Sequence, residues 1–388
     1  MSRKVCIVTG TRAEWGLLSG IARQLNMCSD IDLQIIATNM HLSDRHGHTI
    51  DEIIQEGFKV SAQVPMLDDA NSDCDTVRSM AKCMHGMAEA FDNLRPHIVV
   101  LLGDRFEMLA VATAATIMRI PIVHLHGGEI SEGAIDDSMR HAITKLSALH
   151  LTSTEEYRQR VIQMGENPER VINTGAIGVY NVMNVATMTL EQLRESLDFE
   201  IDHNTLLVTL HPATLDTTPI RTRCQALLNA LDSFPNNKLL ITYPNNDPDG
   251  MIIIEMIEQY ARLHPTRVKL IPSLGLTRYM SALKYVAAVV GNSSSGIIEV
   301  PSMGIPTVNI GCRQKGRIAA TSVIDCEPDT DSIVQAITKA LSNDFKEQAQ
   351  KTVNPYYRPD TLQLIVKAIA TTPIETLHTK HFHDIGKP

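Results

Sequence analysis

Short apolar runs alternate with longer amphipathic stretches along most of this chain, and no other feature limits its fold so strongly. The runs have the length of buried strands, and each is followed by enough chain to form a helix and return. Strands joined in this way pair in parallel, because a parallel partner needs a crossover of a dozen or more residues. The expected fold is therefore α/β, with doubly wound parallel sheets covered by helices on both faces.

The predicted strands fall into two groups. The first comprises 5–9, 33–38, 98–102, 120–125, 149–152 and 171–174, and the second comprises 206–210, 238–242, 268–271, 287–290 and 307–310. A chain of 388 residues also exceeds what one hydrophobic core usually serves. We therefore expect an N-terminal Rossmann-like domain at 1–180, a linker at 181–204, a second Rossmann-like domain at 205–355, and a C-terminal helix and tail at 356–388.

Charge and cysteine usage exclude several classes of protein. With 35 Lys and Arg against 44 Asp and Glu, the formal net charge is −9, which gives no basic footprint for nucleic acid. The seven cysteines are scattered without a CxxC pair, so we expect reduced thiols, no metal site and a cytoplasmic protein. No apolar run approaches the ~20 residues of a membrane-spanning helix, and no membrane partner is expected.

In doubly wound sheets, ligands bind at the carboxyl ends of the strands, so the residues that follow each predicted strand are the candidates. Arg12 follows 5–9 in Gly10-Thr11-Arg12, where its guanidinium can bind a phosphate. Asp104 and Arg105 follow 98–102, and an ion pair between them is the structural alternative. The other candidates of this half are His41, His126, Glu129 and Asp136. Carboxylates and imidazoles at neighbouring strand ends can transfer protons, although Asp136 could also simply cap a helix.

The second half has polar residues in corresponding positions. Its sharpest signal is GNSSSG (291–296) after the strand at 287–290, where hydroxyls and a helix start can bind a diphosphate without a fixed positive charge. Candidate residues of this half are His211, Asn245, Ser293, Ser294, Glu299 and Arg313. For Glu299, one role is to accept both hydroxyls of a ribose. Helix capping and surface charge are the structural alternatives for the serines and for Arg313.

Several familiar motifs are missing. The first loop is not GxGxxG, and the chain has no GxSxG, HExxH or Walker A sequence, which disfavours dinucleotide-binding, serine hydrolase, zinc peptidase and P-loop chemistry. His41, His46 and His48 lie close in sequence but do not complete a typical metal-ligand set. We therefore expect neither a metal nor a cofactor, and we expect His41 to contact a ligand instead.

Seven segments, taken together and in order, resemble a known family. They are GTRAEWG (10–16), GDRFE (103–107), HLHGGE (124–129), GAIDDSMRHAITKLS (133–147), HP (211–212), GNSSSGIIEVPS (291–302) and RQKGR (313–317). The pattern is similar to that of the hydrolysing UDP-N-acetylglucosamine 2-epimerases of bacterial sialic acid biosynthesis, over about residues 3–370. The resemblance implies the GT-B fold, in which a cleft lies between two Rossmann-like domains.

The resemblance also implies a reaction. In this family, UDP leaves by anti elimination across C1 and C2 of the sugar, and water then adds to the bound 2-acetamidoglucal to release N-acetylmannosamine. The match assigns catalytic carboxylates to Asp104 and Asp136. Many relatives have Glu where this chain has His126, so either His126 or Glu129 takes the third acid–base role.

The remaining roles carry over in the same way. His211 matches a residue near the diphosphate and is counted with the catalytic groups. The residues matched or expected to bind the UDP-sugar are Arg12, His41, Arg105, Asn245, Ser293, Ser294, Glu299 and Arg313. The non-hydrolysing branch typically reads GTRPEAIK at the first loop, and GTRAEWG lacks that lysine, which favours release of free sugar and UDP.

Three alternatives stay open. The same chemistry on UDP-2,4-diacetamido-2,4,6-trideoxyglucose would serve legionaminic acid synthesis, and the contacts that distinguish this sugar are expected in the loops at 39–48 and 66–80. A GT-B glycosyltransferase would need an acceptor, and a nucleotide-sugar sensor would bind UDP without turnover. Relatives commonly form dimers or tetramers, so a homodimer or homotetramer is expected.

Overall fold

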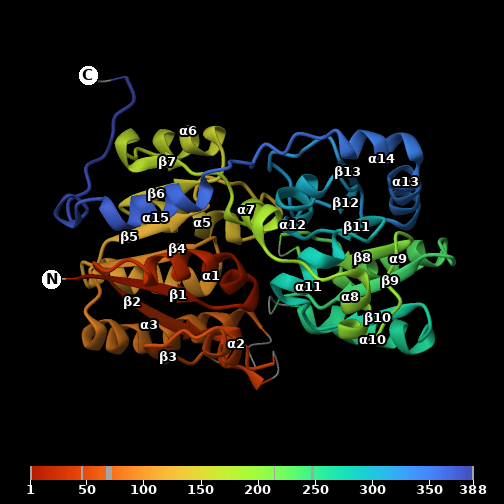
Figure 1. The fold of residues 1–388 in the computed structure, drawn as a ribbon, viewed down its shortest axis with the longest axis horizontal. Coiled ribbons are helices and arrows are strands. Elements are labelled where there is room, and N and C mark those ends of the chain that lie inside the picture. Colours follow the sequence, from red (N-terminus) through yellow and green to blue (C-terminus); the bar gives the residue numbers. More distant parts are fainter. Residues whose placement is uncertain (1, 45–46, 67–71, 214, 246–248, 387–388) are drawn as a thin grey trace. The chain divides into compact units, whose positions relative to one another are not determined.

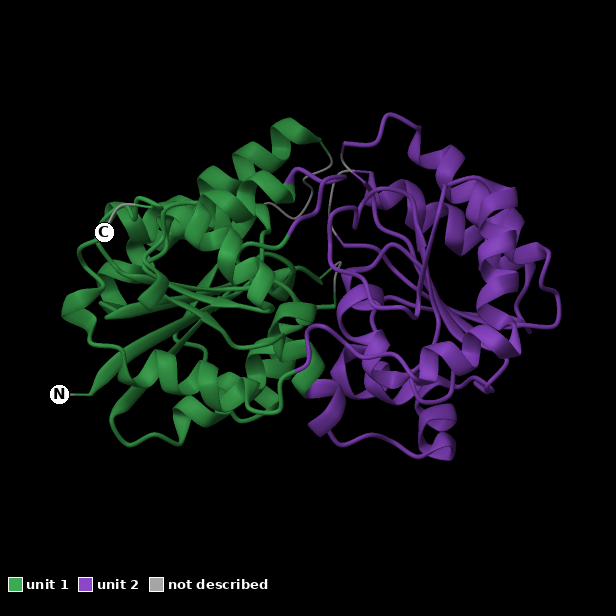
Figure 2. Cartoon of the chain, turned by 90° about the horizontal axis from the view of Figure 1, so that it is seen from above, with its two compact units in different colours: residues 1–129, 136–180, 358–388 green, residues 130–135, 181–357 purple. Residues whose placement is uncertain are grey.

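The structure is a computed structural model that describes residues 2–386 except 45–46, 67–71, 214 and 246–248. The chain forms two compact units, coloured separately in Figure 2. Unit 1 contains residues 1–129, 136–180 and 358–388, and unit 2 contains residues 130–135 and 181–357. The chain therefore passes from one unit to the other four times, at 129/130, 135/136, 180/181 and 357/358.

Unit 1 is built on a seven-stranded parallel sheet with the strand order β3-β2-β1-β4-β5-β6-β7 (Figure 1). In chain order its strands are β1 (Arg3–Thr9), β2 (Ile31–Thr38), β3 (Ala62–Val64), β4 (Ile98–Leu102), β5 (Ile122–Leu125), β6 (Leu149–Thr152) and β7 (Val171–Asn173). The strand order runs outward in both directions from β1 and β4. In such a sheet the loops at the carboxyl ends of the two central strands diverge and leave room for a ligand.

Helices cover both faces of this sheet. They are α1 (Arg12–Asn26), α2 (Ile50–Gln55), α3 (Asp73–Leu94), α4 (Phe106–Ile117), α5 (Asp136–Leu146), α6 (Glu155–Gln163) and α15 (Thr361–Thr371), with α7 (Ile177–Asn184) at the unit boundary. Alternate residues of β1 are buried on opposite faces. Val5 and Ile7 pack with α1, α2 and α15, whereas Cys6 and Val8 pack with α3 and α4. Short 3-10 helices lie at Asn39–Leu42, Pro168–Arg170 and Ile374–Thr376.

Unit 2 repeats this plan with six parallel strands in the order β10-β9-β8-β11-β12-β13. The strands are β8 (Thr205–Thr209), β9 (Lys238–Thr242), β10 (Val268–Ile271), β11 (Ala288–Gly291), β12 (Thr307–Ile310) and β13 (Val323–Cys326). The helices are α8 (Leu190–Leu197), α9 (Ile220–Asp232), α10 (Gly250–Leu263), α11 (Gly275–Ala282), α12 (Ser294–Ile298), α13 (Thr330–Leu341) and α14 (Asn343–Gln350), with a 3-10 helix at Val300–Met303. Residues of α9, α10 and α13 pack on one face, and residues of α8 and α11 pack on the other.

The predicted fold class of two doubly wound parallel α/β sheets is confirmed. The sequence pattern does not predict β3 and β13, because both are short strands at the edge of their sheets and carry little apolar signal. The stretch 181–204, expected as a linker, contains the end of α7 and the whole of α8, and Leu193 and Leu197 of α8 are buried in unit 2. The C-terminal helix α15 packs beside α1 in unit 1.

Candidate active site

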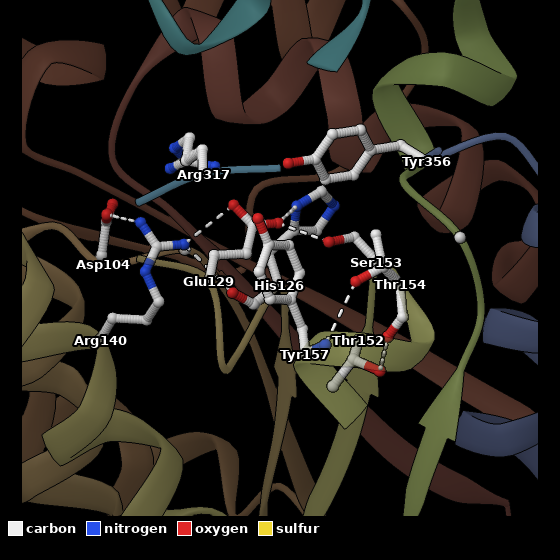
Figure 3. A network of polar contacts seen from close by, with 12 residues as sticks. Asp104, His126, Glu129, Arg140, Thr152, Ser153, Thr154, Tyr157, Arg317 and Tyr356 are labelled. Carbon is white, nitrogen blue, oxygen red and sulfur yellow. Dashed lines mark hydrogen bonds and ion pairs between the residues drawn. The ribbon is translucent and has the colours of Figure 1, made fainter. Parts of the chain in front are cut away.

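A buried polar cluster in unit 1 lies where β4, β5 and β6 end (Figure 3). Its central residue is Arg140 of α5, which is only 1% exposed. The guanidinium forms an ion pair with Asp104, which follows β4. It also donates to Oε2 of Glu129 at 3.2 Å and to the backbone carbonyl of His126 at 3.1 Å. One permanent cation therefore ties together residues that follow two neighbouring strands.

His126 and Glu129 form a hydrogen-bonded pair within this cluster. Nδ1 of His126 lies 2.8 Å from Oε1 of Glu129, and the hydroxyl of Ser153, which follows β6, donates to the same oxygen at 2.7 Å. Because a carboxylate only accepts, Nδ1 donates its proton, and a neutral imidazole with its proton on Nδ1 has its lone pair on Nε2. Nε2 is buried and has no hydrogen-bond partner within the described part of the chain. A buried, oriented imidazole with an unused lone pair is suited to proton transfer.

The backbone around His126 is strained. His126 has a φ of +65°, a left-handed conformation that is uncommon for a residue with a Cβ atom. Gly128 follows with a φ of +80°, and a Cβ atom there would lie 2.6 Å from the carbonyl oxygen of Tyr157 in α6. The glycine thus lets the loop that carries His126 lie directly against α6.

Asp136, the other candidate carboxylate of this half, is the first residue of α5. It precedes Arg140 by four residues, so the two side chains lie on the same face of the helix. Asp136 is half-buried, whereas Glu129 is 1% exposed. Three of the predicted catalytic residues, Asp104, Glu129 and His126, are therefore joined directly through Arg140, and Asp136 shares a helix face with it.

A second buried cluster lies where β1 and β4 end. Arg105 is 8% exposed, and its Nε donates to Oε1 of Glu107 at 2.7 Å, so its partner is Glu107. The backbone N–H of Gly10 donates to Oε2 of Glu14 at 2.7 Å, and a Cβ atom at Gly10 would lie 2.8 Å from Oε1 of Glu107. Burial, together with the neighbouring charge of Glu107, raises the pKa of Glu14 to about 8. Glu14 is thus mostly neutral at pH 7.

Arg12 and His41 both have partners within unit 1. Arg12 begins α1 and forms an ion pair with Glu52 of α2, with 2.7 Å between its Nε and Oε2 of Glu52. His41 is fully buried, with Nε2 at 3.0 Å from Oγ1 of Thr9 and Nδ1 at 2.8 Å from Oγ1 of Thr49. Burial lowers the pKa of His41 to about 4, so the ring is neutral. Both ring nitrogens of His41 therefore contact protein hydroxyls, and its contact with a ligand stays a prediction.

In unit 2, several of the predicted nucleotide-binding residues gather around Asn292. The side chain of Asn292 accepts the backbone N–H of His211 at 2.7 Å and donates to its carbonyl at 2.9 Å. The backbone carbonyl of Asn292 accepts from Arg313 at 3.3 Å and from Gln314 at 2.9 Å. The backbone N–H of Asn245 donates to Nδ1 of His211 at 3.1 Å, which leaves the proton of the neutral ring on Nε2. Loops that follow β9, β8, β11 and β12 are therefore tied together at one edge of the sheet.

The serine-rich turn belongs to the same edge of unit 2. Ser293 precedes α12, and its side chain forms no capping hydrogen bond, which speaks against simple helix capping as its role. Ser293 and Ser294 are both half-buried, and the hydroxyl of Ser295 contacts the hydroxyl of Tyr279. Glu299 is 8% exposed and ends α12. The predicted residues Ser293, Ser294 and Glu299 thus lie on one short helical segment.

Three residues of these clusters escape sequence reasoning. Arg140 has only a weak signal, a cation one turn after Asp136 in an amphipathic helix, and Asn292 lies unmarked inside the serine-rich motif. Ser153 has no signal of its own. Within the ranges that the structure describes, no three His, Cys, Asp or Glu side chains could hold a metal ion. No described helix is both long and apolar enough to span a membrane.

Comparison with known proteins places these clusters in context. Residues 23–370 match the family model described as UDP-N-acetylglucosamine 2-epimerase. The chain is 39% identical to the GDP/UDP-N,N'-diacetylbacillosamine 2-epimerase (hydrolyzing) of Campylobacter jejuni, over 99% of both chains. It is 36% identical to polysialic acid biosynthesis protein P7 of Escherichia coli, over 95% of this chain and 93% of that one. It is 38% identical to the UDP-N,N'-diacetylbacillosamine 2-epimerase (hydrolyzing) of Legionella pneumophila, over 88% of this chain and 90% of that one.

Solved structures support the fold. The crystal structure of UDP-GlcNAc 2-epimerase from Neisseria meningitidis bound to UDP-GlcNAc matches with a TM-score of 0.79 at 18% identity, covering 95% of this chain and 100% of that one. The family model covers most of the chain, and relatives above 30% identity are covered almost completely. This chain therefore belongs to the UDP-N-acetylglucosamine 2-epimerase family, as an enzyme of its hydrolysing UDP-sugar branch.

Proposed function

We propose that this enzyme hydrolyses a UDP-activated 2-acetamido sugar with inversion at C2. In the first step, C2 loses its proton, the bond between C1 and the UDP oxygen breaks, and a double bond forms between C1 and C2. In the second step, the hydroxyl of a water molecule adds to C1. A proton adds to C2 on the face opposite to the one from which the first proton was removed. The reaction consumes one water, releases UDP and the free 2-epimer, and needs no oxidant or reductant.

The observation that carries this proposal is the pair of His126 and Glu129 beside Asp104. Both oxygens of Glu129 accept hydrogen bonds, from His126 and Ser153 on one side and from Arg140 on the other. Glu129 is thus fully engaged as an orienting group, whereas Nε2 of His126 is buried and without a partner in the described structure. We assign removal of the C2 proton to His126, with Glu129 stabilising the imidazolium that forms.

Epimerisation requires a second proton-transfer group, because the proton must return to the other face of C2. We assign this step, and assistance to the departure of UDP, to Asp104 and Asp136. Arg140 contacts Asp104 directly and shares a helix face with Asp136, so it fixes one carboxylate and its charge acts on both.

Unit 2 supplies the groups that we propose bind UDP. Arg313 provides a positive charge for the diphosphate, and Ser293 and Ser294 provide hydroxyls that are not used as helix caps. The side chain of Asn292 holds the backbone of His211, and its backbone carbonyl accepts from the guanidinium of Arg313. Glu299 has the two acceptor oxygens that the hydroxyls of a ribose require.

UDP-N,N'-diacetylbacillosamine, which is UDP-2,4-diacetamido-2,4,6-trideoxyglucose, is the substrate that we propose first. Two relatives named for this sugar are 39% and 38% identical to the chain. UDP-N-acetylglucosamine is the second candidate, because a polysialic acid biosynthesis protein is 36% identical over 95% of the chain. The loops at 39–48 and 66–80, where the distinguishing contacts are expected, include residues 45–46 and 67–71, which lie outside the described residues.

Proton NMR in D2O tests both the reaction and the substrate. Purified enzyme is incubated with either UDP-sugar, without added metal or acceptor. We expect UDP and a free manno-configured sugar carrying deuterium at C2, formed faster from the diacetamido substrate. A faster reaction of UDP-N-acetylglucosamine would reverse the order of the two substrates. A product that still carries UDP, or no conversion of either sugar, would contradict the hydrolytic function.

The role of His126 has its own test. His126→Gln keeps a polar side chain beside Glu129 but removes the basic nitrogen. We expect the variant to lose turnover while UDP binding is retained. It should also lose the exchange of the C2 proton of unreacted substrate with solvent deuterium. Turnover close to that of the wild type would transfer the base role to Asp104 or Asp136.

A further inference from the structure

The C-terminal tail of the chain packs on unit 1, at the end of α5 that is far from Asp136. Leu377 is buried in the core of unit 1, and the backbone carbonyl of Thr379 accepts from Arg170 at 3.4 Å. The backbone N–H of His383 donates to the carbonyl of Gly165 at 2.9 Å, and the ring of Phe382 lies 5.0 Å from the ammonium of Lys145. The tail is therefore a fixed part of unit 1 at these residues.

Lys380 of this tail reaches the last turn of α5. Its ammonium donates to the backbone carbonyls of Lys145 at 2.5 Å and Ser147 at 2.8 Å, with the carbonyl of Thr144 at 3.5 Å. The last carbonyls of a helix have no partner within the helix, and the negative end of the helix dipole attracts a cation. An ammonium with three protons satisfies several such carbonyls at once. Lys380 thus acts as a C-terminal cap supplied from more than 230 residues away in sequence.

A buried carboxylate holds Lys380 in this position. Glu166 is 2% exposed, and its Oε2 lies 2.8 Å from Nζ of Lys380 and 2.9 Å from Nε2 of His150. Its Oε1 accepts from Lys145 at 2.6 Å. Burial alone would raise the pKa of Glu166, but hydrogen bonds from His150, Lys145 and Lys380 lower it to about 2. The carboxylate therefore stays charged and keeps the ammonium in place.

The helix that Lys380 caps carries the central cation of the active site. α5 has 11 residues, so it forms a rod of about 16 Å, and Arg140 lies one turn before Thr144 on it. The hydroxyl of Thr144 lies 3.2 Å from Nδ1 of His124, and Nε2 of His124 lies 2.7 Å from the carbonyl of Gly103, the residue before Asp104. A shift of α5 along its axis would therefore reach Asp104 through Arg140 and through His124.

We propose that Lys380 is a positioning residue, which fixes the last turn of α5 and thereby sets the place of Arg140 relative to Asp104 and Glu129. The proposal rests on the proposed function, because it takes the cluster around Arg140 as the site of proton transfer. Lys380 touches none of these three residues in the described contacts, so its effect on catalysis passes through the helix. The C-terminal tail would thus affect catalysis although it is far from Arg140 in the sequence.

The test compares Lys380→Met with Lys367→Met in the full-length enzyme. Lys367 is an exposed lysine of α15, in the same C-terminal region, so the control makes an identical change away from α5. For Lys380→Met we expect kcat to fall by about 10- to 100-fold, as small displacements of catalytic groups do. KM for the UDP-sugar and Kd for UDP should stay within about twofold of the wild type, and Lys367→Met should match the wild type.

Two further variants separate the helix cap from the ion pair and from overall folding. Lys145→Met removes a partner of Glu166 but leaves the contacts of Lys380 with the helix carbonyls, so it should lower kcat less than Lys380→Met. Lys380→Arg keeps a charged donor at the helix end and should restore part of kcat. Hydrogen exchange of the backbone amides in 136–147 should be faster in Lys380→Met than in Lys367→Met, with unit 2 unchanged.

The following results would overturn the role of Lys380 or the proposed function. Equal kcat values for Lys380→Met and Lys367→Met would overturn the inference. A parallel loss of kcat, UDP affinity and melting temperature, without recovery in Lys380→Arg, would make Lys380 a residue of general stability and would also overturn it. If the wild type converts neither UDP-sugar, the proposed function fails, and the exchange pattern alone still shows whether Lys380 fixes α5.

Discussion

Asp104, which follows β4, and Asp136, which begins α5, allow a matched test of catalysis at the scale of single residues. Asp104→Asn and Asp136→Asn remove a charge but keep the shape of the side chain. We expect either change to lower kcat by about 10²- to 10⁴-fold, the usual contribution of a proton-transfer group. Kd for UDP, measured by calorimetry, should change little, because Ser293, Ser294, Glu299 and Arg313, which we propose bind UDP, belong to unit 2.

Asp137→Asn is the control for this pair. Asp137 is the residue after Asp136, its side chain is 26% exposed, and its partner is His141 at 3.5 Å. The substitution should leave kcat within about twofold of the wild type. Near-normal rates in both Asp104→Asn and Asp136→Asn would remove these residues from the mechanism.

The two buried glutamates beside Gly10 should respond differently to the same substitution. Glu107 is the carboxylate that faces the buried cation of Arg105, so Glu107→Gln should cost about 3–5 kcal/mol of unfolding free energy. Glu14 has its pKa raised to about 8, so it is already neutral near pH 7, and Glu14→Gln should not lower the free energy of unfolding there. Urea unfolding at pH 7 measures both. An equal loss in the two variants would contradict the assignment of the charge to Glu107.

Glu14 also predicts a pH dependence. Its pKa is raised in the folded state, so as the pH rises the folded protein keeps a proton that the unfolded chain has already released. The stabilisation from this proton is complete below the pKa that Glu14 has in the unfolded chain, and it is lost as the pH rises to about 8. The free energy of unfolding of the wild type should therefore fall relative to Glu14→Gln between pH 5 and pH 8. A constant difference across this range would show that Glu14 titrates normally.

At the scale of an element, the loop between β5 and α5 depends on a glycine that faces α6. Gly128→Ala would place its Cβ 2.6 Å from the carbonyl oxygen of Tyr157, at a φ of +80°. Gly57→Ala is the control, because Gly57 has a φ of +88° but no atom within 4 Å of the added Cβ. Both variants bear the cost of the backbone conformation, about 1–2 kcal/mol, and only Gly128→Ala adds the collision.

The measurement for this pair combines thermal unfolding with kcat. We expect Gly128→Ala to melt at a lower temperature than Gly57→Ala and to lose most of its turnover, since the loop carries His126 and Glu129. Equal melting temperatures and rates would mean that the loop adapts to the added methyl group at no cost.

Elements with a strong local signal could be predicted from the sequence, and contacts between distant residues could not. The apolar run at 98–102 predicts β4 with the bounds that the structure shows, because the strand is buried on both faces. β3 has three residues at a sheet edge, and no comparable run marks it. The sequence placed Asp104, His126 and Glu129 at strand ends, but the ion pair of Asp104 with Arg140 spans 36 residues and depends on how α5 packs. The partners of His41 show the same limit, since burial and not residue type decides what the ring contacts.

At the scale of the whole molecule, the C-terminal segment is part of the core of unit 1. Leu362, Ile365, Ile369 and Leu377 are all at most 9% exposed there. Burying one such side chain contributes roughly 1.5–3 kcal/mol, so the four together match the net stability of a typical domain, about 5–15 kcal/mol. A fragment of residues 1–180 should therefore show no cooperative thermal transition by circular dichroism.

The matched fragment carries residues 358–386 joined after residue 180 by a short Gly/Ser linker. The guanidinium of Arg358 donates to the backbone carbonyl of Asn173 at 3.0 Å, so the added segment begins close to the end of the first. We expect this fragment to melt cooperatively. A cooperative transition of the 1–180 fragment at the same temperature would show that the C-terminal segment is dispensable for folding.

The four passages of the chain between its units also restrict how such enzymes can exchange parts. A single genetic crossover near residue 180 between this gene and a relative would give a hybrid in which each unit contains a foreign piece: 130–135 in unit 2 and 358–388 in unit 1. Both foreign pieces lie against surfaces that they did not evolve with. Transfer of the sugar preference of one member to another therefore needs three segments to move together, and homologous recombination at one point should rarely yield an active chimaera.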